Sequence, residues 1–377
     1  MISAVKKAVV VVSLLFTSTL LLAAPPKQAS PEKEPLVIGY YQGGDYIYYK
    51  KILLETVKSL MALGYVEKKE IPDFEGEEAK PIWDWLVENA QSDKIQFSNS
   101  FFVTANWNDR ERQALQSVLM DRLNAKEVDL VLAMGTWAGQ DLATDNHSVP
   151  TLVLSTTEPV LAGIVPSADD SGFKHVNATV DPERYQKQIK IFHDYVPFKK
   201  LGVAFENTVE GRSYAALQTV YEKAKILGFE VVECHTISDT HDQSRADSTV
   251  LECIEKLSNE ADAIYLTAQG GVHNGTLPAI VKIANEHHVP TFSQTGGDEV
   301  RHGVMLSLSQ AGFKYVGRHH AETVGRVWAG ELPGDISQIF QEPVRMAINL
   351  ESAEAIGFNP PIMLLGLADE IYTSIEP

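Results

Sequence analysis

The sequence has few positively charged residues compared with its acidic ones, and this excludes some classes of binding partner. The 377 residues hold 32 lysines and arginines against 50 aspartates and glutamates, which gives a formal net charge of −18 at pH 7. A surface of this sign repels nucleic acids and anionic lipid headgroups. The sequence has no long run of one charge and no low-complexity tract. We therefore expect most of the chain to fold, and none of it to bind nucleic acid.

Cysteine is nearly absent, and the two that are present are Cys234 and Cys253. Their spacing is not that of a metal site, and no cysteine lies near the N-terminal apolar segment to carry a lipid anchor. In an exported protein these two residues can form a disulfide, or they can remain as two buried thiols. The sequence alone leaves both possibilities open.

Catalytic motifs are missing as well. The sequence contains no Gly-x-Ser-x-Gly, no P-loop and no His-Glu-x-x-His. The pairs His287-His288 and His319-His320 are adjacent in sequence, so on a helix the two rings of a pair point in different directions and form no chelate. We expect His319 and His320 to lie on a solvated helix face. The sequence thus predicts a protein that is not an enzyme and that uses no metal or cofactor.

The N-terminus carries a recognisable signal. Lys6 and Lys7 precede an apolar run over residues 8–24, which ends in small residues and two prolines. This is the pattern of a cleavable secretory signal peptide. The alternative is an uncleaved membrane anchor, for which the run is at the short limit. We predict a signal peptide over 1–23, a proline-rich leader over 24–34, and a periplasmic mature protein.

Beyond the leader, short apolar runs alternate with longer amphipathic ones. The strand-like runs are residues 36–41, 95–104, 130–134, 151–155, 201–205, 230–234, 263–266, 290–293 and 304–308. The helix-like runs are residues 48–64, 110–123, 182–195, 213–227, 248–259, 277–287 and 313–329. Apolar strands between amphipathic helices indicate an α/β fold with parallel sheets covered on both faces. An acidic, turn-rich stretch and a short helix interrupt the pattern as an insertion over 65–89, whose role the sequence does not reveal.

A ligand site in such a fold lies beyond the carboxyl ends of the strands. The residues that follow the predicted strands are small, hydroxyl-bearing, amide or acidic, and some are aromatic. Small residues allow a ligand to approach the backbone, carboxylates bind ammonium groups, and helix N-termini bind carboxylates. The candidate ligand-binding residues are Gln42, Asp45, Tyr46, Gly135, Thr136, Trp137, Thr156, Thr157, Glu158, Glu206, Asn207, Gln269, Gly270, Thr295 and Asp298. The alternative is that these residue types only make turns and cap helices.

The order of these segments resembles a known family. DLVLAMGTWAGQDLA followed by VPTLVLSTTEPVLAGIV is similar to the periplasmic substrate-binding component of ABC transporters, of type I fold, in the group that includes tryptophan- and tyrosine-type binding proteins. VNATVDPERYQKQIKIFHDYVPFKKLGVAFEN, ADAIYLTAQGG and PVRMAINLESAEAIGF continue the resemblance, which runs from Leu36 to near Ala355.

The resemblance implies a two-lobed type I fold of two parallel sheets flanked by helices, with hinge crossovers near 160–165, 308–312 and 342–346. Lobe 1 would comprise 35–161 plus 310–342, and lobe 2 would comprise 162–309 plus 343–377. It implies a monomer that captures a small, amino-acid-like ligand between its lobes and delivers it to an ABC permease in the inner membrane. The alternative is a sensor module of the same fold that reports to a membrane receptor or a histidine kinase.

The sequence departs from the family's pattern at the presumed cleft. Trp137 stands where a small residue or proline is usual, and Glu206-Asn207 replaces an Asn-Pro pair. The family's ligand is therefore not carried over to this chain. A glutamate in the cleft at position 206 would favour a ligand with a cationic group.

Overall fold

We examined a computed structural model of the chain, which describes residues 34–309, 311–341, 343 and 345–376. The predicted signal peptide and all but the last residue of the predicted leader lie outside the described residues. No helix within the described part of the chain is long and apolar enough to cross a membrane.

The first lobe is built on a parallel sheet of order β2-β1-β3-β4-β5. Its strands are β1 (Leu36–Gln42), β2 (Ile95–Thr104), β3 (Leu130–Met134), β4 (Thr151–Leu154) and β5 (Val176–Ala178). The central strand β3 is buried along its whole length, as a strand covered on both faces should be. The first four strands confirm the prediction from the apolar runs.

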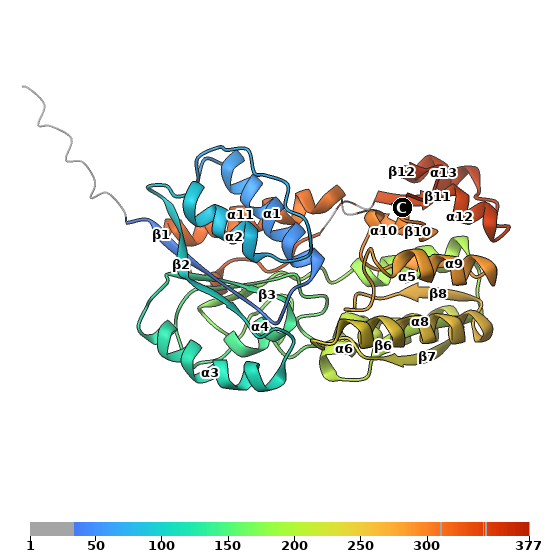
Figure 1. The fold of residues 1–377 in the computed structure, drawn as a ribbon, viewed down its shortest axis with the longest axis horizontal. Helices are drawn as coiled ribbons and strands as arrows, with labels where there is room; N and C mark the ends of the chain where they lie inside the picture. Colours follow the sequence, from blue (N-terminus) through green and yellow to red (C-terminus); the bar gives the residue numbers. More distant parts are fainter. Residues whose placement is uncertain (1–33, 310, 342, 344, 377) are drawn as a thin grey trace, which may run out of the picture. The chain divides into compact units, whose positions relative to one another are not determined.

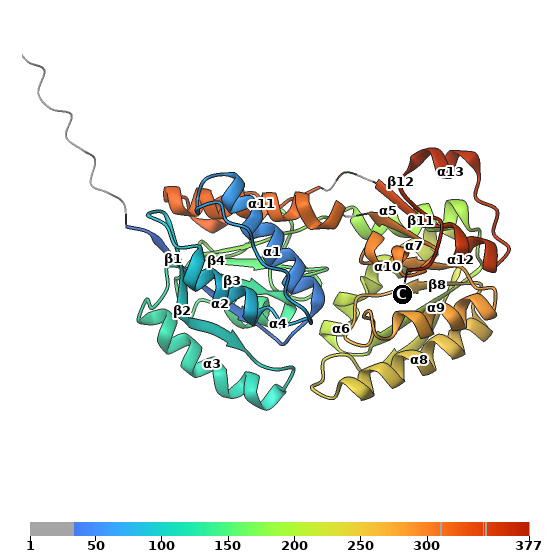
Figure 2. The same ribbon diagram turned by 45° about the horizontal axis from the view of Figure 1, so that its top comes forward.

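Helices cover both faces of this sheet. They are α1 (Ile47–Ala62), α2 (Lys80–Asn89), α3 (Asp109–Asn124), α4 (Gly135–Leu142) and, from much later in the sequence, α11 (Lys314–Ala329). Apolar side chains of α1, α2 and α11 share one core with the sheet, and those of α3 and α4 share the core on the opposite face. Helices α1 and α11 run side by side in both ribbon views (Figures 1 and 2).

The second lobe is built on a sheet of order β12-β11-β10-β9-β8-β6-β7. Its strands are β6 (Lys200–Glu206), β7 (Glu230–Thr236), β8 (Ala263–Leu266), β9 (Thr291–Ser293), β10 (Leu306–Ser309), β11 (Arg345–Asn349) and β12 (Ala368–Tyr372). All neighbours pair in parallel except β10 and β11, which are antiparallel. The segment PVRMAINLESAEAIGF, which continues the family resemblance, contains β11 and α12 (Leu350–Ala355).

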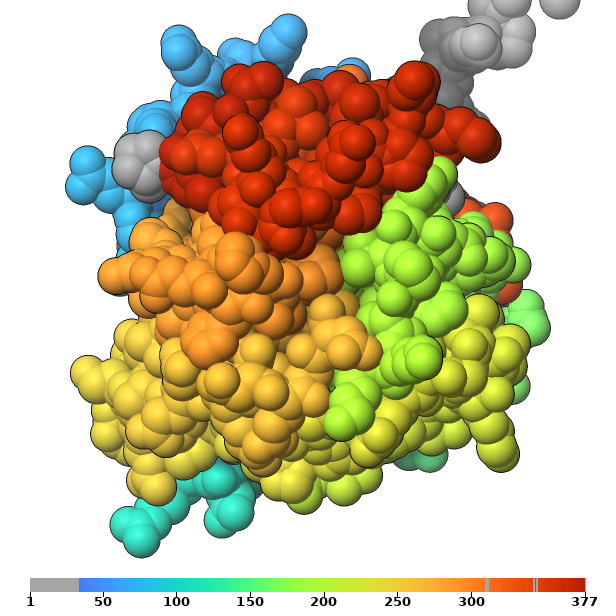
Figure 3. Space-filling view, turned by 90° about the vertical axis from the view of Figure 1, so that its right-hand side faces the viewer, coloured from blue at the N-terminus to red at the C-terminus, as the bar shows by residue number. Residues whose placement is uncertain are grey.

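The helices of the second lobe also form two layers. One core contains side chains of α5 (Arg184–Tyr195), α7 (Leu217–Leu227), α12 and α13 (Ile362–Leu367). The other contains side chains of α8 (Gln243–Glu260), α9 (Leu277–Glu286) and α10 (Gly297–Arg301), and the short α6 (Val209–Tyr214) follows β6. The space-filling view shows the C-terminal segment, in red, lying against the orange segment that contains α9 (Figure 3).

The first lobe extends further along the chain than the sequence predicts. The prediction assigns residues 162–309 to lobe 2, whereas β5 pairs with β4 of the first sheet, with Thr151 opposite Val176. The first crossover therefore follows Val180, which bridges to Ile339, instead of lying near 160–165. A three-residue strand with one β-branched side chain gives almost no sequence signal, which explains the error.

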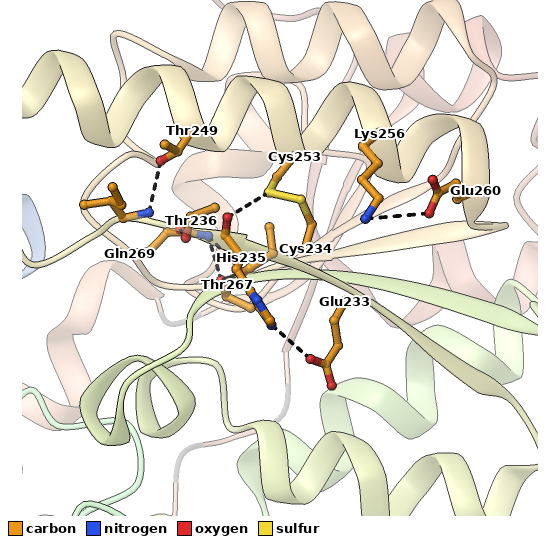
Figure 4. Close-up of a disulfide and its surroundings, with 12 residues drawn as sticks. Glu233, Cys234, His235, Thr236, Thr249, Cys253, Lys256, Glu260, Thr267 and Gln269 are labelled. Carbon is orange, nitrogen blue, oxygen red and sulfur yellow. Dashed lines mark hydrogen bonds and ion pairs between the residues drawn. A yellow bond between two sulfur atoms is a disulfide. The ribbon is translucent and has the colours of Figure 1, made fainter.

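Cys234 and Cys253 form a disulfide, which answers the question that the sequence left open (Figure 4). Cys234 lies on β7 and Cys253 lies on α8, with 5.5 Å between their Cα atoms. Close to this bond, the backbone N–H of Ile237 donates to the Thr249 hydroxyl of α8 at 3.0 Å. The disulfide and this hydrogen bond together hold the end of β7 against the helix.

Candidate ligand-binding site

Two adjoining pockets lie between the lobes, at the carboxyl ends of the strands. The first, which we call the hinge pocket, is lined by Tyr46, Tyr48, Ile52, Ser155, Thr156, Thr157, Thr179, Asp181, Arg184, Tyr185, Ala268, Gln294, Thr295, Phe313, Val316, His320 and Phe340. The second, which we call the acidic pocket, is lined by Asp45, Tyr46, Tyr49, Glu77, Trp107, Ser155, Thr157, Tyr214, Ser238, Asp239, Thr240, Gln243, Ala268, Gln269 and Gly270. Their volumes are about 800 and 580 Å³, including space open to solvent. The pockets share Tyr46, Ser155, Thr157 and Ala268, so they are two ends of one cleft.

Two unsatisfied polar groups mark the hinge pocket as a place for a ligand. Gln294 is 2% exposed; its Oε1 accepts from the backbone N–H of Ala268 at 2.7 Å, and its Nε2 has no partner among the described residues. The Thr156 hydroxyl is likewise buried without a partner there. Arg184 and Asp181 line the same pocket. Buried donors cost free energy unless they are bonded, and a ligand carboxylate would supply acceptors.

His320 also faces the hinge pocket, and here the prediction of a solvated helix face is wrong. This residue is 1% exposed, because α11 packs that face against α1 and the end of β5. Its ring nitrogens lie 3.3 Å from the Thr56 hydroxyl and 3.2 Å from the Thr179 hydroxyl. Burial lowers the pKa of His320 well below its ordinary value, so the ring is neutral at pH 7 and the pocket gains no positive charge from it.

The acidic pocket takes its name from Asp45, Glu77 and Asp239. Asp239 follows β7; its carboxylate accepts from the Tyr214 hydroxyl at 2.7 Å and from the Trp137 side chain. Burial raises the pKa of Asp239 to about 7, although these two hydrogen bonds oppose the rise. Asp239 is therefore poised to change its charge near neutral pH.

The insertion over 65–89 supplies the second carboxylate of this pocket. Lys50 of α1 is 8% exposed and donates to backbone carbonyls of the insertion, at 3.2 Å to Glu75, at 2.5 Å to Gly76, and also to Phe74. The next residue is Glu77, which lines the pocket. Burial is the main cause that raises the pKa of Glu77. The insertion thus contributes directly to the cleft wall.

Aromatic side chains form the rest of this wall. Tyr46 and Tyr49 pack edge to face with ring centroids 5.3 Å apart, and the Trp107 indole donates to the Asp45 carbonyl at 2.9 Å. Tyr49 can take this position only because residue 135 is glycine. A Cβ at Gly135 would stand 1.7 Å from the Tyr49 hydroxyl, and its φ of 83° also disfavours any other residue.

Trp137 stands behind the wall and does not line either pocket. It is 4% exposed and lies in the first turn of α4, which begins at Gly135, and not in a loop as the sequence suggests. Its ring packs against Trp107 with centroids 5.4 Å apart and under the Arg112 guanidinium at 4.6 Å. Arg112 is held by Asp141 at 2.9 Å. The indole therefore supports Trp107 and Asp239.

The structure brings some of the predicted residues together at the cleft and places others behind it. Those that line the hinge or acidic pocket are Asp45, Tyr46, Thr156, Thr157, Gln269, Gly270 and Thr295. Asp298 lines a smaller pocket beside Thr295 and pairs with Lys51 and Arg301. Gln42, Gly135, Thr136, Trp137, Glu158, Glu206 and Asn207 line neither the hinge pocket nor the acidic pocket.

Three predicted polar residues behind the cleft already have protein partners. Glu206, expected to attract a cationic ligand, accepts instead from the backbone N–H of Asp239 at 3.0 Å. Glu158 accepts from the Thr219 hydroxyl at 3.2 Å. Gln42 donates to the Asp45 carboxylate at 2.7 Å. These side chains position the cleft residues or brace the loops around them.

Sequence reasoning missed several cleft residues. They are Tyr185, Arg184, Asp181, Gln294, Tyr214, Glu77 and Asp239. Asp239 lies just after β7, which ends at Thr236. The rule that ligand-binding residues follow the carboxyl ends of strands therefore includes it. That rule does not cover Glu77, which comes from an insertion, or Arg184, which begins α5.

Side chains of the two lobes also contact each other across the cleft. The Tyr48 hydroxyl of α1 lies 2.9 Å from the Glu299 carboxylate and 3.0 Å from the Thr295 hydroxyl. Beside it, Lys51 forms an ion pair with Asp298 of α10. These contacts join the lobes on the rim next to the hinge pocket.

The profile of one family, described as ABC transporter substrate binding protein, matches residues 84–372. The chain belongs to this family. This confirms the resemblance seen in the sequence, and the chain is therefore a substrate-binding protein of the ABC-transporter type. A tyrosine-binding protein of Clostridioides difficile is 25% identical over 278 residues, which are 74% of each chain.

Solved structures show the same fold. The ABC domain from Streptococcus pneumonia in complex with L-Trp is 18% identical, with a TM-score of 0.68, over 90% of this chain and 100% of the other. A conserved domain protein of Vibrio cholerae is 19% identical, with a TM-score of 0.67, over the same shares. These similarities support the two-lobed α/β architecture.

Proposed function

We propose that this substrate-binding protein captures a small, amino-acid-like ligand between its lobes and delivers it to an ABC permease. The observation that carries the proposal is the hinge pocket, which Arg184 and Asp181 also line. There the buried donors of Thr156 and Gln294 have no partner in the part of the chain that the structure describes. A ligand carboxylate suits these donors and the guanidinium, and an α-ammonium suits Asp181. The tyrosine-binding relative supports this ligand class.

The proposal includes a hinge motion. Residues 34–181 with 311–341 would form one lobe, and residues 182–309 with 345–376 would form the other, with the crossovers as hinges. The protein would act as a monomer in the periplasm after removal of residues 1–23, and it would catalyse no reaction.

A thermal-denaturation screen of residues 24–377 against the common amino acids, amines and organic acids tests this proposal. A ligand at about 100 times its Kd should add about 2.7 kcal/mol to the free energy of unfolding. Its carboxamide, which lacks the carboxylate charge, should bind more weakly. Small-angle scattering should show a smaller radius of gyration with the ligand. A screen in which no amino-acid-like compound stabilises the protein would overturn the proposal.

A further inference from the structure

The acidic pocket has a charge that its own lining does not balance. Asp45, Glu77 and Asp239 reach it from three separate segments, and its lining contains no lysine or arginine among the residues described. Two other carboxylates near the cleft have cationic partners, Asp141 with Arg112 and Asp298 with Lys51. Asp239 and Asp45 differ from these two because they accept hydrogen bonds from neutral groups.

Neutral side chains donate hydrogen bonds to two of the pocket carboxylates. Asp239 accepts from the Tyr214 hydroxyl at 2.7 Å, and Asp45 accepts from the Gln42 amide at 2.7 Å. His273 and Lys51 are the basic side chains that oppose the rise in the pKa of Glu77. Each of these is already held by another carboxylate, His273 by Asp247 at 2.9 Å and Lys51 by Asp298.

Aromatic rings complete the environment that an organic cation requires. Tyr46, Tyr49, Trp107 and Tyr214 line the same pocket as the carboxylates. Electron-rich ring faces attract ammonium and guanidinium groups, and more strongly where water is excluded. The Tyr46 hydroxyl is also buried without a partner among the described residues, in the wall that joins this pocket to the hinge pocket. Carboxylates and rings together favour a cation over a neutral aromatic side chain.

We propose that the acidic pocket binds a cationic side chain of the ligand, an amine or a guanidinium, and that Glu77 of the insertion selects for it. This rests on the proposed function, because the hinge pocket then holds the amino-acid end of the same molecule. The ligand class is a basic amino acid or a compound with the same charges at the same two ends.

Lys50 makes the selectivity of Glu77 possible. Its buried ammonium binds carbonyls of Phe74, Glu75 and Gly76, the residues immediately before Glu77. The loop is therefore fixed at the pocket, and Glu77 loses little conformational entropy when a cation binds. Removing the ammonium by Lys50→Met should release the loop and weaken cation binding, although the pocket carboxylates remain.

Calorimetric titration of the protein with L-arginine, L-lysine, L-tryptophan and L-tyrosine tests the proposal. We expect L-arginine or L-lysine to bind at least about tenfold more tightly than the two aromatic amino acids. Glu77→Gln should reduce the affinity for the basic amino acid by about tenfold or more. The matched control is Asp73→Asn, which makes the same carboxylate-to-amide change at an exposed position of the same insertion and should leave affinity unchanged.

The outcomes separate this inference from the proposed function. Tighter binding of a neutral aromatic amino acid, or equal affinities of the Glu77→Gln and Asp73→Asn variants for a basic one, would overturn the inference and leave the proposed function standing. If none of these compounds nor any other amino-acid-like compound binds, both fall. Circular dichroism of each variant shows whether a lost affinity reflects a lost fold.

Discussion

Single residues set the chemistry of the cleft, and Asp239 shows how. Its carboxylate is surrounded by the neutral donors Tyr214 and Trp137 and stands near two further acids, Glu206 and Glu210. Burial and the neighbouring acids favour the protonated form, and the hydrogen bonds favour the ionised form. Burial prevails and raises the pKa to about 7, so a small change of pH alters the charge that a ligand meets.

Binding of a cationic ligand should therefore strengthen as the pH rises. Between about pH 6 and pH 8 Asp239 changes from mostly protonated to mostly ionised, and affinity for L-arginine should increase by up to about tenfold.

The stability of the ligand-free protein should change in the opposite direction as the pH rises. An unfolded aspartate has a pKa near 3.9, so unfolding releases this proton, and the free energy of unfolding should fall from about pH 4 to pH 7. Titrations at several pH values measure the first effect, and Asp239→Asn should remove both.

Sequence could predict those cleft residues that follow a strand directly. Asp45 and Tyr46 come after β1, and Thr156 and Thr157 come after β4, so parallel strands alone bring them to one edge. Trp137 was predicted at the surface of the cleft, but tertiary packing under Arg112 places it behind Trp107. No local pattern in the sequence encodes such a contact between side chains of different elements.

Helices and strands are predicted from the sequence more reliably than the contacts between them, because hydrophobic periodicity is a local property of the sequence. The long helices α1, α3, α8 and α11 and the apolar strands lie where amphipathic and apolar runs indicate. Short elements are lost: β5 has three residues and β12 lies on a sheet edge without an apolar run. The disulfide between β7 and α8 also could not be predicted, since cysteine pairing depends on distance in the fold.

The disulfide should contribute measurably to the free energy of unfolding. It closes a short loop, with a sequence separation of 19 residues. The variant with both Cys234→Ala and Cys253→Ala should lose about 3 kcal/mol of unfolding free energy, because its unfolded chain is less constrained. Urea denaturation measures this loss, and the unaltered protein in a reducing agent serves as the control. Equal midpoints for the oxidised protein and the double variant would contradict the prediction.

The whole molecule depends on how its lobes meet. Lys51 and Asp298 form a half-buried ion pair between α1 and α10, next to the contact of Tyr48 with Glu299. Burial would raise the pKa of Asp298, but Lys51 and Arg301 hold it below its ordinary value. The pair therefore favours the arrangement in which the lobes touch, whether or not a ligand is bound.

Lys51→Met should shift the ligand-free protein towards open forms. An ion pair of this exposure contributes up to about 1 kcal/mol, so ligand affinity should fall by no more than about fivefold. Scattering should report a larger radius of gyration without ligand and an unchanged one with saturating ligand. Lys58→Met is the control, because Lys58 pairs with Glu55 on the same helix at 2.7 Å and joins no second lobe. Identical scattering of the two variants would show that the pair does not hold the lobes.

The position of helix α11 in the sequence also determines when the first lobe can complete its core during synthesis. Ala321, Val324 and Val327 of this helix are buried in the core of the first lobe, against residues made more than two hundred positions earlier. The second lobe likewise receives β11 and β12 from residues 345–372. During synthesis from the N-terminus, apolar surface of both lobes therefore stays uncovered until α11 and these two strands have been made.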